Sequence, residues 1–243
     1  MTVHTEWRER VLVVTLDRPE RRNAVDHATL VALQAAQAEA AEAAARVLVL
    51  TGAPPAFSAG ADLTGVEGGT FADALSATLR GFTELPCTCL AAVDGPALGA
   101  GTQLVVACDL RVATPTSRFG VPAARLGLVV DHWTVERLAR ELGWPVARAM
   151  LLGAETYDGA ALHRTGSVHR LGTLDDAVTW ARELATLAPL TIAGHKVALE
   201  RSAPEPASDA DVEAARAAAW ASADAAAGRA AVLAKRPARF QGR

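Results

Sequence analysis

Several residue types are scarce in this sequence, and each scarcity excludes a class of protein. Its 243 residues include only three cysteines, two lysines and one tyrosine. An odd number of cysteines without an export signal argues for reduced thiols rather than a disulfide framework. Cys87 and Cys89 lack a second cysteine pair and a histidine at zinc-ligand spacing, so no metal site is expected.

The sequence also lacks a large excess of either charge and any long apolar run. The net charge is −3, and the basic residues are scattered among acidic ones, which excludes the basic surface of a nucleic-acid-binding protein. No charge-free run is long enough to cross a bilayer, and no signal peptide is recognisable at the start. We therefore expect a cytoplasmic protein without nucleic-acid or membrane partners.

What the sequence does contain is an alternation of β-branched runs with helical patterns, which predicts an α/β core with largely parallel strands. The predicted strands are 11–16, 47–51, 90–93, 110–113 and a weaker one at 168–170. The predicted helices are 26–45, with Asp26 as its cap, 72–83, 101–108, 131–142, 145–152 and 174–187.

The chain changes character after Leu187, where only alanine-rich helical segments follow. We therefore divide it into a core of residues 1–187 and a helical region of residues 188–243. Such helices bury little apolar surface alone, so we expect them to pack on the core or on another subunit and to support oligomerisation.

Two loops rich in glycine and alanine are the candidates for chemistry. "FSAGADL" (57–63) follows one predicted strand, and Gly95–Gly101 joins another strand to a helix. Small residues leave backbone N–H groups accessible, and a helix start adds unpaired donors, so converging loops would stabilise an oxyanion. The alternative is that each loop serves close packing. A dinucleotide-binding turn is excluded because Leu104 replaces its third glycine, and Ser58 lacks the flanking glycines of a nucleophile elbow.

Five segments in order resemble the crotonase, or enoyl-CoA hydratase/isomerase, superfamily over essentially the whole chain. They are "RPERRNAVD" (18–26), "FSAGADL" (57–63), "AVDGPALGAGTQLVVACDLRVA" (92–113), "FGVPAARLGL" (119–128) and "KRPARFQG" (235–242). The resemblance implies a spiral of ββα units followed by a C-terminal helical trimerisation region, assembled as a homotrimer or dimer of trimers. It also implies an acyl-CoA ligand, with coenzyme A as the only cofactor and no metal.

The same resemblance assigns residues to the site. The oxyanion donors would be the backbone N–H groups of Ala61 and Ala100, and Asp62 would brace the first loop. Arg21 or Arg22 would pair with phosphate oxygens of coenzyme A, as would Lys235 from a neighbouring subunit. The remaining expected contacts to coenzyme A are Ala24, Ala59, Leu63, Gly99 and Pro122.

Two positions depart from the pattern of hydratases, which use one glutamate to activate water and another to supply the α-proton. The resemblance places these glutamates at Gln103 and Ala123. A glutamine amide orients a water or a carbonyl but holds no proton at neutral pH. Because general acid or base catalysis contributes roughly 100-fold to 10,000-fold per group, ordinary hydratase activity is not expected.

One acid, Asp131, follows Ala123 closely in the sequence, in "GLVVDHWT" (127–134). By resemblance it lies where relatives that shift double bonds carry a catalytic carboxylate, and its apolar neighbours suit a proton shuttle. The competing interpretation is that Asp131 only caps the helix that follows.

Three hypotheses follow. The first is an acyl-CoA-binding crotonase of fatty-acid or lipid metabolism, nominally an enoyl-CoA hydratase or isomerase, whose chemistry would involve Asp131 assisted by Gln103. The second is a non-catalytic acyl-CoA carrier that presents acyl chains to another lipid enzyme. The third, a structural subunit without affinity for coenzyme A, leaves both glycine- and alanine-rich loops unexplained.

Overall fold

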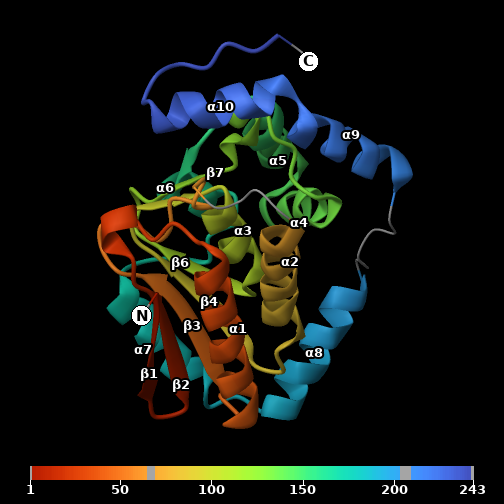
Figure 1. The fold of residues 1–243 in the computed structure, drawn as a ribbon. Helices are drawn as coiled ribbons and strands as arrows, with labels where there is room; N and C mark the ends of the chain where they lie inside the picture. The colour runs from red at the N-terminus through yellow and green to blue at the C-terminus, as the bar shows by residue number, and fades with distance from the viewer. Residues whose placement is uncertain (1, 65–68, 203–208, 242–243) are drawn as a thin grey trace. The chain divides into compact units, whose positions relative to one another are not determined.

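A computed structural model describes residues 2–64, 69–202 and 209–241 (Figure 1). The described residues form two compact units, one within 1–119 and 157–204 and the other within 120–156 and 205–243. The predicted division into residues 1–187 and 188–243 follows the sequence and not this spatial grouping, and it stays a prediction.

The first unit is built on a mixed sheet with the spatial order β1-β2-β3-β4-β6-β9. β1 and β2 are antiparallel, and every other neighbouring pair is parallel. The strands are β1 (Val3–Arg8), β2 (Val11–Leu16), β3 (Val47–Gly52), β4 (Thr88–Val93), β6 (Leu110–Ala113) and β9 (Arg170–Leu171). A smaller sheet contains β5 (Pro96–Leu98), β7 (Arg118–Gly120) and β8 (Tyr157–Asp158).

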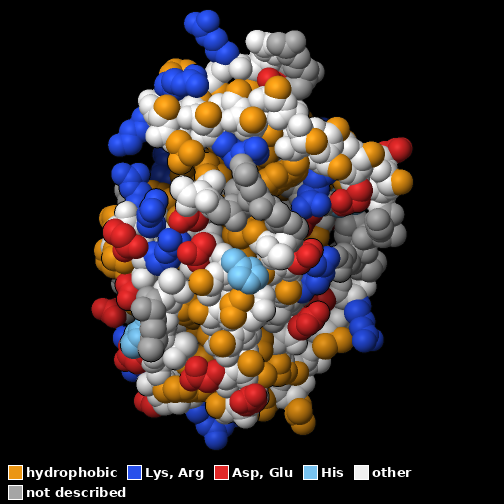
Figure 2. Space-filling view, viewed as in Figure 1, with side chains coloured by type: hydrophobic (Ala, Val, Ile, Leu, Met, Phe, Trp, Pro, Cys, Tyr) orange, Lys and Arg blue, Asp and Glu red, His pale blue; other side chains and the backbone are white. Residues whose placement is uncertain are grey.

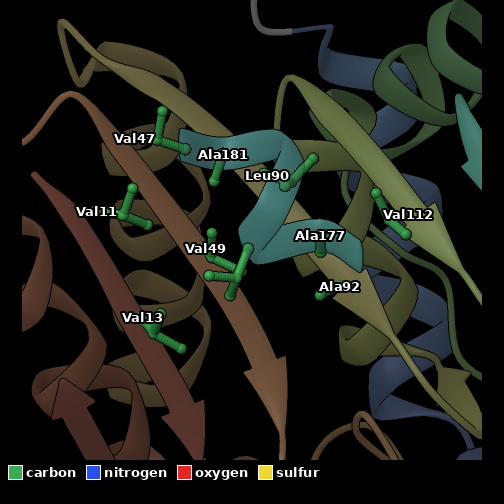
Figure 3. Packing of buried hydrophobic residues seen from close by; sticks show 10 residues of the cluster. Val11, Val13, Val47, Val49, Leu90, Ala92, Val112, Ala177 and Ala181 are labelled. Atoms are coloured by element: carbon green, nitrogen blue, oxygen red, sulfur yellow. The ribbon is translucent and has the colours of Figure 1, made fainter. Parts of the chain in front are cut away.

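Helices cover both faces of the main sheet, which explains why β3 and β4 are almost continuously apolar and buried. α7 (Leu174–Leu184) lies behind the sheet in Figure 1, while α1 (His27–Glu42) lies in front, next to α2 (Gly69–Glu84). Figure 3 shows Ala177 and Ala181 of α7 directed at strand residues such as Val49 and Leu90, all part of one buried cluster. Small side chains on α7 allow the helix to approach the sheet closely.

The remaining helices of this unit are short or peripheral. They are η1 (Pro19–Arg21), α3 (Ala100–Ala107), α6 (Gly159–Arg164) and α8 (Pro189–Ser202). The α/β prediction with mostly parallel strands is confirmed, but it missed β1, β5, β7, β8 and α6. α7 also ends at Leu184 rather than residue 187, and the last strand covers Arg170–Leu171 rather than 168–170.

The second unit is mainly helical. It contains η2 (Pro122–Leu126), α4 (His132–Leu142), α5 (Trp144–Leu152), α9 (Ala210–Ala221) and α10 (Ala223–Leu233). Gly228 of α10 lies against η2, where an added Cβ would come within 2.4 Å of the Leu126 carbonyl oxygen. The Trp220 indole donates a 2.9 Å hydrogen bond to the Val129 carbonyl. α9 and α10 are therefore held on residues 120–156 although they lie far along the chain.

Charged side chains of both signs are interspersed on the face shown in Figure 2, with apolar ones between them. None of the helices in the described ranges combines the length and apolar character that crossing a membrane requires.

Candidate functional site

The two predicted loops lie side by side in the first unit. Ser58 N donates to the Pro96 carbonyl at 3.0 Å, and Leu98 N donates to the Ser58 carbonyl at 2.9 Å. These bonds form a short parallel bridge between Ser58 and Ala97. Because the loops follow the adjacent parallel strands β3 and β4, they meet at the carboxyl edge of the sheet.

The Ala61 amide faces away from its neighbouring segment. Val25 N donates to the Gly60 carbonyl and Asp62 N donates to the Val25 carbonyl, both at 2.8 Å. In this parallel bridge the bonds to Val25 come from the residues on either side of Ala61. Among the described residues, the Ala61 N–H has no hydrogen-bond partner.

Ala100 supplies the second unpaired donor. It is the first residue of α3, which begins after Gly99 at φ 53°, and no side chain caps this helix. Within the described part of the chain the Ala100 N–H is unpaired, as the first amides of a helix are. The residue is only 5% exposed, so this donor is also largely shielded from water.

Glycine is required where the loops approach each other. Gly60 has φ +103°, and a Cβ on it would lie 2.8 Å from the Leu98 carbonyl oxygen and 3.6 Å from the Ala100 nitrogen. A Cβ on Gly101 would lie 2.6 Å from the Ser58 carbonyl oxygen. The two unpaired amides therefore belong to backbone segments in direct contact.

Gln103 lies one helical turn after Ala100 in α3. It is 7% exposed, and its buried Oε1 atom has no hydrogen-bond partner among the described residues. An unpaired buried acceptor costs about 1–3 kcal/mol, so a donor from a ligand or a bound water would be stabilising there.

Asp62 is held on both carboxylate oxygens. Oδ1 accepts hydrogen bonds from Thr64 Oγ1 at 2.6 Å and Thr64 N at 3.2 Å, and Oδ2 lies 3.0 Å from Arg18 Nη2. The Thr64 hydrogen bonds and the Arg18 charge hold the pKa of Asp62 below its usual value, although burial opposes them. Arg18 also pairs with Asp26 at 3.1 Å and donates to the Ala24 carbonyl. These contacts fasten residues 18–26 to the first loop.

Sequence reasoning missed the positioning roles of Arg18, Asn23 and Ser58. Asn23 has φ 55° and is buried, and its Nδ2 donates to the Ala53 and Ala56 carbonyls at 2.7 and 2.6 Å. The Ser58 hydroxyl donates to the Asn23 carbonyl at 2.8 Å. Asparagine tolerates the left-handed conformation, so Asn23 was the one residue whose type could have indicated this turn from the sequence.

The other predicted contact residues of this unit lie around the two loops. Arg21 and Arg22 are exposed at the end of η1, and Ala59 is exposed, whereas Leu63 is partly buried. The Arg22 carbonyl accepts from Ala59 N at 2.9 Å. The first unit thus brings together Arg21, Arg22, Ala24, Ala59, Ala61, Asp62, Leu63, Gly99, Ala100 and Gln103.

Four predicted residues belong to the second unit: Pro122, Ala123, Asp131 and Lys235. Pro122 opens η2, which includes Ala123, and Lys235 is exposed after α10. Asp131 caps α4, and its Oδ1 accepts a 2.8 Å hydrogen bond from Thr134 N. The cap itself is confirmed, whereas both the interpretation that Asp131 only caps and the catalytic interpretation stay predictions.

Within residues 2–64, 69–202 and 209–241, no three His, Cys, Asp or Glu side chains gather in a way that would hold a metal ion. Backbone N–H groups dominate the site instead, and they can stabilise negative charge on an oxygen atom.

Residues 6–243 match the family model described as enoyl-CoA hydratase/isomerase. The chain is 42% identical over 236 residues to the Mycobacterium bovis protein named probable enoyl-CoA hydratase echA6, covering 96% of this chain and 97% of that protein. It is 34% identical over 206 residues to 2,3-dehydroadipyl-CoA hydratase from Escherichia coli, covering 80% of each.

Solved structures agree in fold. An enoyl-CoA hydratase/isomerase from Pseudoalteromonas atlantica superposes with a TM-score of 0.86 at 26% identity, over 99% of this chain and all of that one. Methylmalonyl-CoA decarboxylase in complex with 2-nitronate-propionyl-CoA gives a TM-score of 0.91 at 22% identity, over 100% of this chain and 99% of that one. This chain therefore belongs to the enoyl-CoA hydratase/isomerase family and has the crotonase fold.

Proposed function

We propose that this protein binds acyl-CoA thioesters of lipid metabolism and that the Ala61 and Ala100 N–H groups hold the thioester carbonyl oxygen. The observation that carries the proposal is the pair of unpaired amides on two loops in contact. A thioester oxygen is an acceptor that both amides can share. Donors fixed before the ligand arrives need no reorganisation, and losing one such donor costs an enzyme about 100-fold to 1,000-fold in kcat.

α3 strengthens this site because its N-terminus adds the positive end of the helix dipole. The whole helix from Ala100 to Ala107 is buried, and charge–dipole interactions are less screened away from water. Negative charge developing on the thioester oxygen would therefore be stabilised. The proposed contacts to coenzyme A are the ones that the resemblance predicts around residues 21–24 and 59–63, with Pro122 and Lys235.

Binding does not imply hydration in this chain. At the position of one hydratase glutamate, Gln103 offers an unpaired amide oxygen that cannot take up a proton at neutral pH. Ala123, at the other, has no titratable group. We propose that hydration is slow and that any proton transfer at the acyl chain uses Asp131, with Gln103 orienting the ligand.

The second candidate function is a non-catalytic acyl-CoA carrier for another lipid enzyme. The observation that favours it is the engagement of Asp131 as the cap of α4, which gives that carboxylate a structural role without any chemistry. Slow double-bond migration that depends on Asp131 would favour the isomerase, and binding without turnover would favour the carrier.

Calorimetric titration with saturated acyl-CoA tests the proposed binding, and matched glycine variants test its site. Gly60→Ala places a Cβ against the second loop, whereas Gly166 also has a positive φ but has nothing within 4 Å of an added Cβ. We expect Gly60→Ala to weaken binding about tenfold or more, and Gly166→Ala to leave it unchanged. No binding by the wild type, or equal effects of both variants, would overturn the proposal.

A further inference from the structure

A cleft of about 390 Å³ lies in the first unit, away from the two loops. Its walls come from the end of α1, including Ala41, the connection from Leu184 to Leu187, and Ile192 of α8. These side chains are apolar, and the volume is within the range of about 300–1,000 Å³ typical of small-molecule sites.

The cleft is at the opposite edge of the main sheet from the candidate active site. Its lining residues Arg10, Arg46 and Cys87 each directly precede a strand (β2, β3 and β4), whereas the two loops follow the carboxyl ends of β3 and β4. Six-residue strands span roughly 20 Å. A ligand in the cleft would therefore occupy a second site.

Cys87 is the one cysteine among the described residues that line the cleft. Other reactive side chains lie close to it and form a cluster with it. Behind Cys87, the Lys196 ammonium lies 2.8 Å from an Asp109 carboxylate oxygen, 3.6 Å from the Cys89 sulfur and 3.1 Å from the Cys87 carbonyl oxygen. Lys196 is buried, and Cys87 is 6% exposed but lines the cleft. Cys87 is thus the member of the cluster that a ligand in the cleft reaches.

The cluster favours Cys87 as the nucleophile. The adjacent Cys89 thiol and the Lys196 charge lower the pKa of Cys87, although burial opposes them. The neighbouring Cys87 and burial raise the pKa of Cys89 well above its usual value, and the Cys89 thiol donates to the Phe82 carbonyl at 3.4 Å. Burial lowers the pKa of Lys196, but the Cys89 sulfur and the Asp109 carboxylate raise it to about 12. Lys196 therefore stays an ammonium and does not compete as a nucleophile at neutral pH.

Two arginines give the cleft a positive rim. Neither Arg10 nor Arg46 forms an ion pair among the described residues, and the buried Arg46 Nε atom has no hydrogen-bond partner. An apolar cleft beside two unpaired cations suits a ligand with an apolar chain and an anionic head group.

We propose that Cys87 accepts acyl groups from acyl-CoA thioesters, with the acyl chain held in the cleft and the phosphates near Arg10 and Arg46. The Cys87 thiolate attacks the thioester carbon, a carbon–sulfur bond to Cys87 forms, and the bond to coenzyme A breaks. Coenzyme A leaves as a thiolate and takes up a proton equivalent to the one that Cys87 lost. The product is an S-acyl cysteine, and no oxidant or reductant is needed. The inference rests on the proposed function only for the class of acyl donor.

Intact-mass spectrometry of the full-length protein tests this inference with two donors. Decanoyl-CoA carries the anionic head group, and the decanoyl thioester of N-acetylcysteamine does not. Trypsin leaves all three cysteines in one peptide, residues 81–111, so fragment ions must assign the label. We expect one hydroxylamine-sensitive decanoyl group on Cys87, formed about tenfold faster than an acetyl group because more methylenes are buried.

Variants separate the parts of the proposal. Cys87→Ser should abolish labelling, whereas Cys108→Ser, which removes a buried cysteine outside the cluster, should not. Arg46→Gln should slow labelling by decanoyl-CoA but not by the uncharged donor, and Arg164→Gln, at an exposed arginine outside the cleft, should slow neither. Label on Cys89 or Cys108, an amide-linked label, or no label from the uncharged donor would overturn the inference. Because that donor lacks coenzyme A, its result is independent of acyl-CoA binding at the two loops.

Discussion

At the residue scale, Gln103 and Ala123 decide which reaction the two amides can support. Polarising a thioester carbonyl needs only N–H donors, whereas adding water across a double bond also needs a group that removes a proton and one that delivers it. Both positions lack a titratable group, and the Gln103 amide oxygen is unpaired. Under the proposed function, the chain therefore binds and polarises the thioester but hydrates it slowly.

Restoring the acids should restore hydration. We expect Gln103→Glu combined with Ala123→Glu to raise the hydration rate of crotonyl-CoA about 100-fold or more, because each acid–base group contributes roughly 100-fold to 10,000-fold. Loss of enoyl absorbance measures the rate. The control is Gln103→Leu combined with Ala123→Leu, which changes both side chains without adding acids. A wild-type rate as high as that of the glutamate variant would contradict this account.

Lys196 makes stability depend on pH in the alkaline range. Its pKa is raised from 10.5 to about 12 in the folded chain, so its contribution is fully present below pH 10.5 and is lost as the pH rises toward 12. The difference corresponds to about 2 kcal/mol.

Urea unfolding between pH 9 and 12 checks this expectation. The single tyrosine and the three cysteine thiols also titrate in this range, so the comparison between lysine variants isolates the contribution of Lys196. Lys196→Met should be less stable at pH 9 by about 3 kcal/mol or more, because the Asp109 carboxylate loses its partner, and should lose less stability on going to pH 12. Lys235→Met, at the exposed lysine, should behave as the wild type does. An identical pH slope for both variants would contradict the expected linkage.

At the element scale, α4 combines a structural and a proposed chemical role in Asp131. Asparagine keeps the capping hydrogen bond but cannot move a proton, whereas alanine removes both. We expect Asp131→Asn to stay within about 0.5 kcal/mol of the wild type in unfolding free energy, and Asp131→Ala to lose about 0.5–2 kcal/mol.

The matched control residue is Asp158, which caps α6 by accepting a 2.7 Å hydrogen bond from Ala161 N. Asp158→Ala should cost comparable stability without affecting double-bond migration in a 3-enoyl-CoA. Asp131→Asn should abolish any such migration. Unchanged migration in Asp131→Asn would leave capping as the only role of that residue.

The strands β2, β3 and β4 could be predicted from sequence because they are almost continuously apolar, as is typical of parallel strands covered on both faces. β1 could not, since "VHTEWR" mixes polar and apolar residues at the edge of the sheet. The two loops could be predicted because small residues leave backbone N–H groups accessible, and a helix start adds unpaired donors. Arg18 and Lys196 could not, because their partners lie 44 and 87 residues away and no local pattern specifies such contacts.

At the scale of the whole molecule, exposed apolar side chains favour assembly. Leu199 of α8 is 69% exposed, and Leu233 of α10 is 61% exposed. Burial of such side chains would favour association, so they are candidates for the interface of the predicted homotrimer or dimer of trimers.

Sedimentation velocity at micromolar concentration checks this prediction, with an expected mass of three or six chains. Leu199→Glu should shift the protein toward smaller species, because it places a charge on the proposed interface. Arg201→Glu introduces a glutamate at an exposed position of the same helix and should shift it less. A wild-type protein that sediments as a single chain would contradict the prediction.

The most direct test of the central claim is the infrared carbonyl stretch of a bound acyl-CoA labelled with ¹³C at the thioester carbon. Two N–H groups on one oxygen lengthen the carbonyl bond, so we predict a lower wavenumber for the bound thioester than in water, with a smaller shift in Gly60→Ala and an unchanged one in Gly166→Ala. A bound carbonyl that absorbs at or above its wavenumber in water would contradict the claim that the Ala61 and Ala100 amides hold it.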